Sequence, residues 1–321
     1  MADLPQSRVR EAVPFTKTGI DFCGPFYIKE RKVRNRAKIK VYICVFICFT
    51  IKAIHLEVVS DLTTDGFIAA LRRFVARRGM PEHIHSDNGT NFVGANNKLK
   101  EMYALLNSDT HKEHVAKFAN DHRITWHFTP PYAPHFGGLW EASVKLFKHH
   151  FKRVVGDSLF TFEELNTLVV EIEGILNSRP ITPSSSDLND LLALTPAHYL
   201  IGRATMALPE ARLTEIPTNR LSTWQHITKV RQDFWSRWKL EYLNELQQRS
   251  KWIKDGPDLS TGTIVLIKDK NLPCTQWLLG RIIELHPGRD GVNRVATIKT
   301  ASGNLHRATK LLCPLPYAIP L

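Results

Sequence analysis

Residues 38–50 read KIKVYICVFICFT, and this stretch decides the fold class. It is rich in β-branched and aromatic side chains and is almost continuously apolar from Val41 onward. A strand with one face in solvent alternates apolar and polar residues, whereas a strand buried on both faces does not. The stretch therefore predicts a central strand, covered on both sides.

The segments around this strand predict a mixed α/β layer of helices and strands. Further strands are expected at residues 16–22, 55–59, 83–86 and 124–128. Helices are expected from Thr64, taken as the cap, to Gly79, and at residues 91–106, 112–121, 139–155 and 162–177. We place this layer at residues 13–203, after a polar lead-in of residues 1–12.

The remainder of the chain predicts a long helix and a small β-barrel. Residues 204–254 are expected to form a linker and an amphipathic helix over 222–252, with Trp224, Trp235, Trp238 and Trp252 used for packing or multimer contact. Short strands are expected at residues 263–267, 277–285, 295–299 and 304–307, separated by turns with Gly and Pro. Residues 255–321 therefore predict a small basic β-barrel.

Charge and composition limit the kind of partner. The chain has 43 Lys and Arg against 31 Asp and Glu, a net charge of +12, which favours a polyanion, with nucleic acid ahead of a membrane surface. Its longest apolar run, residues 41–49, is far shorter than the roughly 20 residues of a membrane-spanning helix. None of the cysteines forms a CxxC pair, so neither a disulfide framework nor a structural zinc site is expected.

Three acids stand out by position. Asp21 lies at the end of or within the first strand, Asp87 follows a later strand in SDNGTNF, and Glu141 lies in the first turn of a helix. Carboxylates are the ligands that Mg²⁺ prefers. Each acid also has an ordinary explanation, because Asp is common in turns and Glu complements the dipole at a helix start. Position alone leaves both explanations open.

Five segments in order resemble the integrases of retroviruses and their relatives. TGIDF (18–22), SDNGTNF (86–92) and PPYAPHFGGLWE (130–141) resemble the catalytic core, and LNSRPIT (176–182) and LTPAHYLIGR (194–203) resemble integrases of BEL/Pao long-terminal-repeat retrotransposons. The resemblance implies an RNase H-like fold and a polynucleotidyl transferase that trims a 3′ end and joins it to target DNA. It also implies that Asp21, Asp87 and Glu141 hold two Mg²⁺ or Mn²⁺ ions. The spacing from Asp87 to Glu141 is longer than is usual in retroviral integrases, which fits an additional helix.

Several cations and polar residues are candidates for binding DNA. Lys145, Lys148 and Lys152 recur on the helix face that carries Glu141, although such a row also suits a solvated surface. Asn88 and His135 lie in the loops beside the acids. Arg281, Lys299, Arg307 and Lys310 in the expected barrel are candidates for phosphate contact, with an ordinary charged surface as the alternative. His149 and His150 are adjacent on a helix, so they are not expected to share a metal.

The sequence thus favours an integrase that binds element and target DNA. The resemblance implies a homo-oligomer and a nuclear protein that crosses the cytoplasm in a nucleoprotein complex, and no membrane partner is expected. Two alternatives stay open. A domesticated DNA-binding protein would bind without catalysis, and an RNase H-type nuclease would use the same acids but would not join DNA ends.

Overall fold

The computed structural model divides the chain into two compact units, residues 1–173 and 174–321, which are described separately. The structure describes residues 13–30, 38–87, 91–99, 124–128, 138–185, 187, 190–247, 259–269 and 271–316, with the backbone alone for 138–143. The domain boundaries expected after residues 12, 203 and 254 stay predictions.

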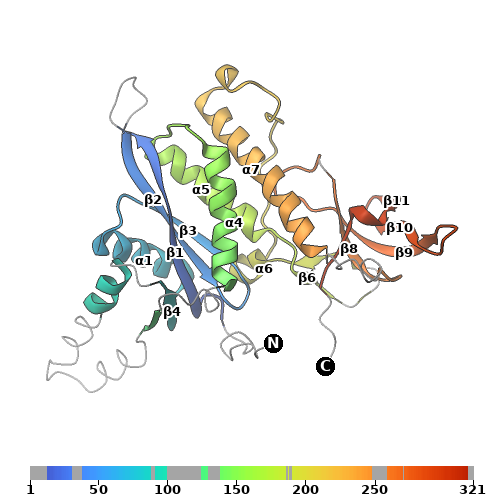
Figure 1. Ribbon diagram of the computed structural model, residues 1–321, viewed down its shortest axis with the longest axis horizontal. Coiled ribbons are helices and arrows are strands. Elements are labelled where there is room, and N and C mark those ends of the chain that lie inside the picture. Colours follow the sequence, from blue (N-terminus) through green and yellow to red (C-terminus); the bar gives the residue numbers. More distant parts are fainter. Residues whose placement is uncertain are drawn as a thin grey trace. The chain divides into compact units, whose positions relative to one another are not determined.

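The first unit is built on a five-stranded mixed sheet with the order β3-β2-β1-β4-β5 (Figure 1). Its strands are β1 (Lys17–Lys29), β2 (Lys38–Cys48), β3 (Ile54–Val59), β4 (His83–Ser86) and β5 (Thr125–Phe128). β1, β2 and β3 pair antiparallel, and β4 and β5 run parallel to β1. With its flanking helices, this is the RNase H-like α/β architecture that was expected.

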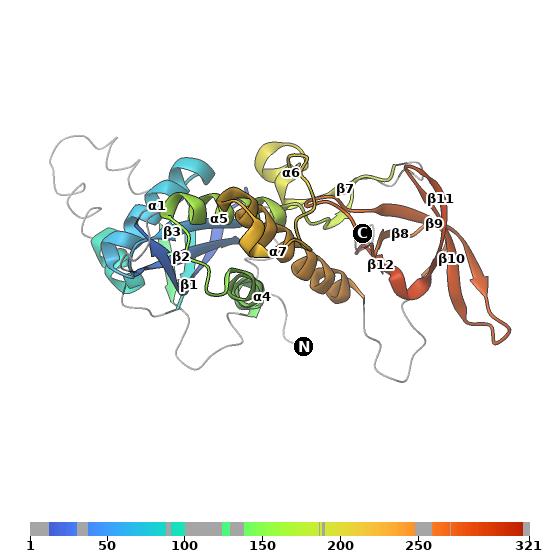
Figure 2. The same ribbon diagram turned by 90° about the horizontal axis from the view of Figure 1, so that it is seen from above.

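Strand β2 is the interior strand that KIKVYICVFICFT predicts. Every residue from Ile43 to Cys48 is buried. On one face Phe46 stacks on Phe74 with ring centroids 4.4 Å apart. Helices α1 (Thr64–Arg78) and α5 (Phe162–Asn177) lie on this side of the sheet, and α4 (Gly138–Val155) lies on the other (Figure 2). Covering both faces removes the need for polar residues in β2.

Two local expectations were wrong. Helix α1 is capped by Thr63 and not by Thr64, because the Thr63 hydroxyl accepts a hydrogen bond from the Gly66 amide at 3.0 Å. The helix does end at Gly79, as expected, with a φ of 86° that glycine adopts without strain. Strand β1 does not stop near Phe22 but continues past a cis Gly24–Pro25 bond, with a register shift between Cys23 and Phe26.

The helix expected at residues 91–106 is confirmed over 91–99. The rest of it, and the helix expected at 112–121, lie outside the described residues. None of the helices in the described part of the chain is long and apolar enough to cross a membrane.

The second unit contains a long helix and a five-stranded antiparallel sheet with the order β11-β10-β9-β8-β12. The elements are β6 (Thr182–Pro183), β7 (Ala193–Leu194), α6 (Pro196–Ile201), η3 (Thr218–Arg220), α7 (Thr223–Leu246), β8 (Ile264–Ile267), β9 (Leu279–Pro287), β10 (Asn293–Thr300), β11 (Gly303–Ala308), η4 (Thr309–Leu311) and β12 (Leu312–Pro314). Strands β8, β9, β10 and β11 were expected. Strands β6, β7 and β12 were not, because a strand of two or three residues has no recognisable pattern.

Strand β8 separates two hydrophobic clusters in this unit. Ile264 and Leu266 belong to one cluster, while Val265 and Ile267 belong to the other. Helix α7 contributes Leu243 to the first cluster and packs Trp235 and Trp238 against Trp277. These contacts confirm a packing role for the two tryptophans. Trp224, which was expected to share this role, is 45% exposed. Trp252 lies outside the described residues.

Candidate active site

Asp21 lies on β1, and Asp87 directly follows β4, the neighbouring strand of the first sheet. Strands β1 and β4 are parallel, and Lys17 pairs with His83 and Gly19 with His85. Continuing this register brings Asp21 opposite Asp87. Neighbouring strands are about 4.8 Å apart, and residues two apart on a strand share a face. The two carboxylates are therefore side by side on one face of the sheet.

The same face is covered by α4, which carries Glu141. The ammonium Nζ of Lys148 on α4 lies 2.8 Å from Oδ2 of Asp21. Lys148 follows Glu141 by seven residues, about two helical turns, so both residues project from the same side of the helix. The Glu141 side chain is outside the described residues. The structure thus places the helix side that bears Glu141 against the strand that bears Asp21.

The pKa of the Cys23 thiol depends on its burial and on the charges around it. Cys23 is two residues from Asp21 on β1 and is 4% exposed. Burial raises the pKa of this thiol to about 12, against the lowering effect of Lys148 and Lys152, while Asp21 raises it further. The thiol is consequently protonated at neutral pH. Cys23 is therefore neither a nucleophile nor a metal ligand in this state.

Asp87 is held by the packing of the opposite sheet face. The preceding residue, Ser86, is fully buried and donates from its hydroxyl to the Asp87 carbonyl at 2.8 Å. The same hydroxyl accepts a hydrogen bond from the Trp126 indole at 2.9 Å. Phe92 stacks on Phe22, with centroids 5.2 Å apart. This aromatic packing fixes the strand ends, so that the exposed Asp87 stays next to Asp21. Asn88 lies outside the described residues.

The residues present fit a hard divalent cation. Asp21 and Asp87 provide neighbouring carboxylates, the ligands that such a cation prefers. Asp21 binds a cationic group in the structure, the ammonium of Lys148. Within the described ranges, no set of three or more His, Cys, Asp or Glu side chains is arranged to hold a metal ion. The expected third ligand is Glu141, whose side chain is not described. The three-carboxylate site therefore stays a prediction.

Sequence reasoning missed three histidines on the same sheet face. His83 and His85 are two residues apart on β4, so their side chains share a face. His127 on β5 pairs with His85. Nδ1 of His83 lies 3.1 Å from Nε2 of His127, and the rings of His85 and His127 stack 4.5 Å apart. Burial, together with the charges of His127 and His83, lowers the pKa of His85 to about 4, so its ring is neutral at pH 7. The sequence pattern that could have predicted this group is His-x-His within a strand, because residues two apart on a strand project from one face.

The α4 lysines have different surroundings. Lys145 and Lys152 are exposed, whereas Lys148 is 35% exposed and bound to Asp21. His149 is exposed and His150 is buried, which confirms that these two histidines face different ways. His135 lies outside the described residues. Two lysines of the row are thus open to a ligand, and the third is held at the acid.

One of the cations expected to bind DNA in the second unit is structural. Arg281 is 3% exposed, and its guanidinium donates to the carbonyls of Gly262 and Asp187, each at 2.8 Å, and of Asp190 at 3.0 Å. The expectation for Arg281 is wrong, because a buried guanidinium occupied by carbonyls does not reach a phosphate.

The other cations of this sheet do not form a single patch. Arg307 pairs with Ala296, whereas Lys299 pairs with Asn304. Residues 296 and 299 are an odd number apart on β10, so Lys299 and Arg307 face opposite sides of the sheet. Lys299 and Lys310 are exposed and Arg307 is half-buried. Phosphate contact by these residues stays a prediction.

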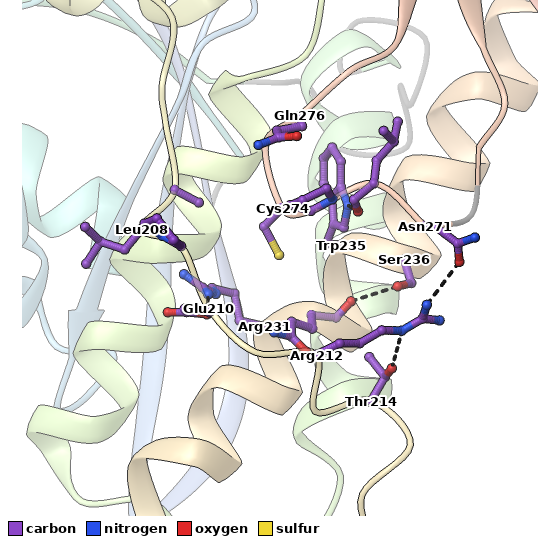
Figure 3. A pocket seen from close by; sticks show the side chains of 15 residues that line it. Leu208, Glu210, Arg212, Thr214, Arg231, Trp235, Ser236, Asn271, Cys274 and Gln276 are labelled. Carbon is purple, nitrogen blue, oxygen red and sulfur yellow. Dashed lines mark hydrogen bonds and ion pairs between the residues drawn. The ribbon is translucent and has the colours of Figure 1, made fainter.

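A cavity of about 320 Å³ lies in the second unit (Figure 3). It is bounded by residues 207–214, by α7 and by residues 271–276. Arg231 binds Glu210 in its wall, and Arg212 donates to Asn271 at 3.0 Å. The charged groups of the wall are therefore largely engaged with each other, and the cavity has no pair of carboxylates.

Residues 14–134 match the integrase core domain. The matched segment contains both Asp21 and Asp87 but ends before Glu141. Residues 222–315 match a family of unknown function, DUF5641. No curated protein matches the sequence.

Solved structures of viral integrases are similar to the chain. One is a simian T-cell lymphotropic virus intasome in complex with PP2A regulatory subunit B56 gamma, with 14% identity and a TM-score of 0.35 over 99% of this chain and 85% of that one. Another is the HTLV-2 integrase catalytic core domain with magnesium in a dimeric form, with 17% identity and a TM-score of 0.32 over 52% and 90%. The trimeric form of the same HTLV-2 domain with magnesium has 17% identity and a TM-score of 0.33, over 54% of this chain and 91% of that one.

Proposed function

We propose that this chain is the integrase of a BEL/Pao-type retrotransposon, which processes the 3′ ends of element DNA and joins them to target DNA. The observation that carries the proposal is the pair of acids, Asp21 and Asp87, side by side on one face of an integrase core domain. The helix that bears Glu141 contacts Asp21 through Lys148. The segments 176–182 and 194–203 support the BEL/Pao assignment.

Asp21, Asp87 and Glu141 would hold two Mg²⁺ or Mn²⁺ ions. When bound, two such ions activate an attacking oxygen and stabilise a leaving oxygen, so that no nucleophile from the protein is needed. The protein then has to hold its carboxylates in place and present the phosphodiester to them. Ser86 and the aromatic layer beneath β4 serve the first purpose.

The exposed lysines Lys145 and Lys152 would hold the phosphate backbone beside the acids. Lys299, Arg307 and Lys310 would add non-specific contacts in the second unit. The net charge of +12 is consistent with binding whose strength comes mostly from phosphates. The active form would be a homo-oligomer in the nucleus, reached through the cytoplasm as a nucleoprotein complex.

The test is a strand-transfer assay with Mg²⁺ or Mn²⁺ and duplex oligonucleotides that carry a free 3′-hydroxyl. Joined products are expected from the wild type and not from Asp21→Asn, Asp87→Asn or Glu141→Gln. The matched control is Glu82→Gln, an exposed acid that precedes β4. Cleavage without joining would indicate a nuclease. DNA binding with neither reaction would indicate an integrase-derived binding protein.

A further inference from the structure

Lys148 occupies the carboxylate that the proposed metal site needs. Its ammonium lies 2.8 Å from Oδ2 of Asp21, and the other oxygen of Asp21 accepts the Phe22 amide at 2.6 Å. The two side chains are 35% and 28% exposed, so the ion pair is open to solvent and to ions. A cation that binds Asp21 must therefore compete with Lys148.

The competition has a direct electrostatic consequence. In water, a unit positive charge about 6 Å from a divalent ion weakens the binding of that ion by about ten-fold. An ammonium that stays at Asp21 would thus keep the site poorly loaded with metal. An ammonium that moves away would remove both the competition and most of the repulsion.

A DNA backbone can draw the ammonium away. Lys148 lies between Lys145 and Lys152 on α4, and both of these neighbours are exposed. A phosphate that binds this row offers Lys148 an alternative anion. Only the side chain of Lys148 has to turn, because a lysine side chain is long and has freely rotating bonds.

We propose that Lys148 is a positioning residue that couples the binding of a DNA backbone to the loading of a divalent metal at Asp21. Without DNA, Lys148 holds Asp21 and disfavours the metal. With DNA, Lys148 moves to a phosphate and Asp21 is released. Coupling between two ligands is reciprocal, so the metal must also strengthen DNA binding by the same factor. This inference rests on the proposed function, because it takes Asp21 as a metal ligand.

The experiment measures Mn²⁺ binding to the full chain from the electron paramagnetic resonance signal of free Mn²⁺. Titrations are run without DNA and with a duplex that lacks a 3′-hydroxyl, after subtraction of the Mn²⁺ bound by the duplex alone. The variants are Lys148→Met, Lys148→Arg, Asp21→Asn and Arg153→Met. Arg153→Met is the matched control, because it removes an equal charge from an exposed residue of the same helix that lies outside the row of Lys145, Lys148 and Lys152.

Without DNA, Lys148→Met is expected to bind Mn²⁺ about ten-fold more tightly than the wild type. Lys148→Arg, which keeps the charge, should bind as weakly as the wild type. DNA should tighten Mn²⁺ binding in the wild type and in Arg153→Met, but not in Lys148→Met. Circular dichroism verifies that each variant is folded.

The proposal is overturned if Lys148→Met binds Mn²⁺ no more tightly than the wild type, or if DNA still tightens its binding. Mn²⁺ binding that is unchanged in Asp21→Asn would overturn it as well, since Asp21 would then not be a ligand. Failure of the proposed function looks different: the coupling would be present in these titrations, while the strand-transfer assay would give no joined product.

Discussion

The substitution Glu173→Gln is predicted to lower the free energy of unfolding of the first unit by about 3–5 kcal/mol, the usual effect of removing one partner from a buried ion pair. Glu173 on α5 is 7% exposed. Its carboxylate binds Nδ1 of the fully buried His55 at 3.2 Å and accepts the Leu56 amide at 2.8 Å. It also pairs with Arg78. Glutamine keeps the size of the side chain but leaves both cations without this charge.

The effect of Glu173→Gln should depend on pH. Burial by itself would lower the pKa of His55, but hydrogen bonds to Glu173 and Glu57 raise it above its ordinary value. Because the unfolded pKa is about 6.5, this stabilisation is complete below pH 6.5 and is lost as the pH rises through the folded pKa.

The carboxylate of Glu173 sets the lower end of the pH range in which this network is stabilising. Burial would raise the pKa of Glu173, but His55, the Leu56 amide and Arg78 lower it. Its stabilisation is therefore present above the unfolded pKa of about 4.3 and is lost as the pH falls through the folded pKa. The difference in the free energy of unfolding between the wild type and the variant should be largest between about pH 4.3 and 6.5, and smaller at pH 9.

The assay is urea unfolding followed by far-ultraviolet circular dichroism from pH 4.5 to 9. Amide hydrogen exchange of residues 54–59 gives a local readout, because Glu173→Gln weakens the acceptor of the Leu56 amide. Glu163→Gln, an exposed acid on the same helix, is the control and should change stability by less than about 0.5 kcal/mol. A loss of stability below about 1 kcal/mol at pH 6, or a loss that grows towards pH 9, would contradict this prediction.

Three other predictions follow from the packing and the charges. Phe46→Ala should cost about 3–5 kcal/mol in urea unfolding, because Phe46 is fully buried and stacked on Phe74. Arg281→Met should cost at least about 3 kcal/mol, since three carbonyls lose their donor, and it should leave the salt dependence of DNA binding unchanged. Lys145→Gln and Lys152→Gln should each reduce the slope of log affinity against log salt by about one, measured by fluorescence anisotropy; unchanged slopes would exclude phosphate contact by these lysines.

The elements that carry the site were predictable because local patterns determine them. The apolar run at 38–50 predicted β2, and a short strand over residues 83–86 that leads into Asp87 was also predicted and is β4. What local patterns could not predict is the course of β1 beyond Gly24–Pro25. A Gly-Pro pair is typical of a turn, but pairing with β2 continues the strand to Lys29 after a register shift. Long-range pairing outweighs the local preference there.

The ion network at His55 was equally hidden, for a related reason. His55 and Glu57 alternate on β3 as the exposed face of a strand would, so the sequence suggests solvated residues. The structure buries both, because Glu173 and Arg73 from two different helices meet them. A charge is stable in a core only when its partners are present, and those partners are far apart in the chain. Alternation therefore predicts which residues share a face, but not whether that face is covered.

Lys148 and Arg281 show the same limit for the candidate site. In the sequence both are cations near expected DNA-binding surfaces, and each contributes one positive charge to the net charge of +12. In the structure, Arg281 is buried and bound to three carbonyls, whereas Lys148 stays partly open beside the carboxylate of Asp21. A cation held by several neutral acceptors supports the fold. A cation held by a partly exposed acid can exchange that acid for a phosphate, and this difference in partners is why we propose Lys148 as the residue through which DNA and metal influence each other.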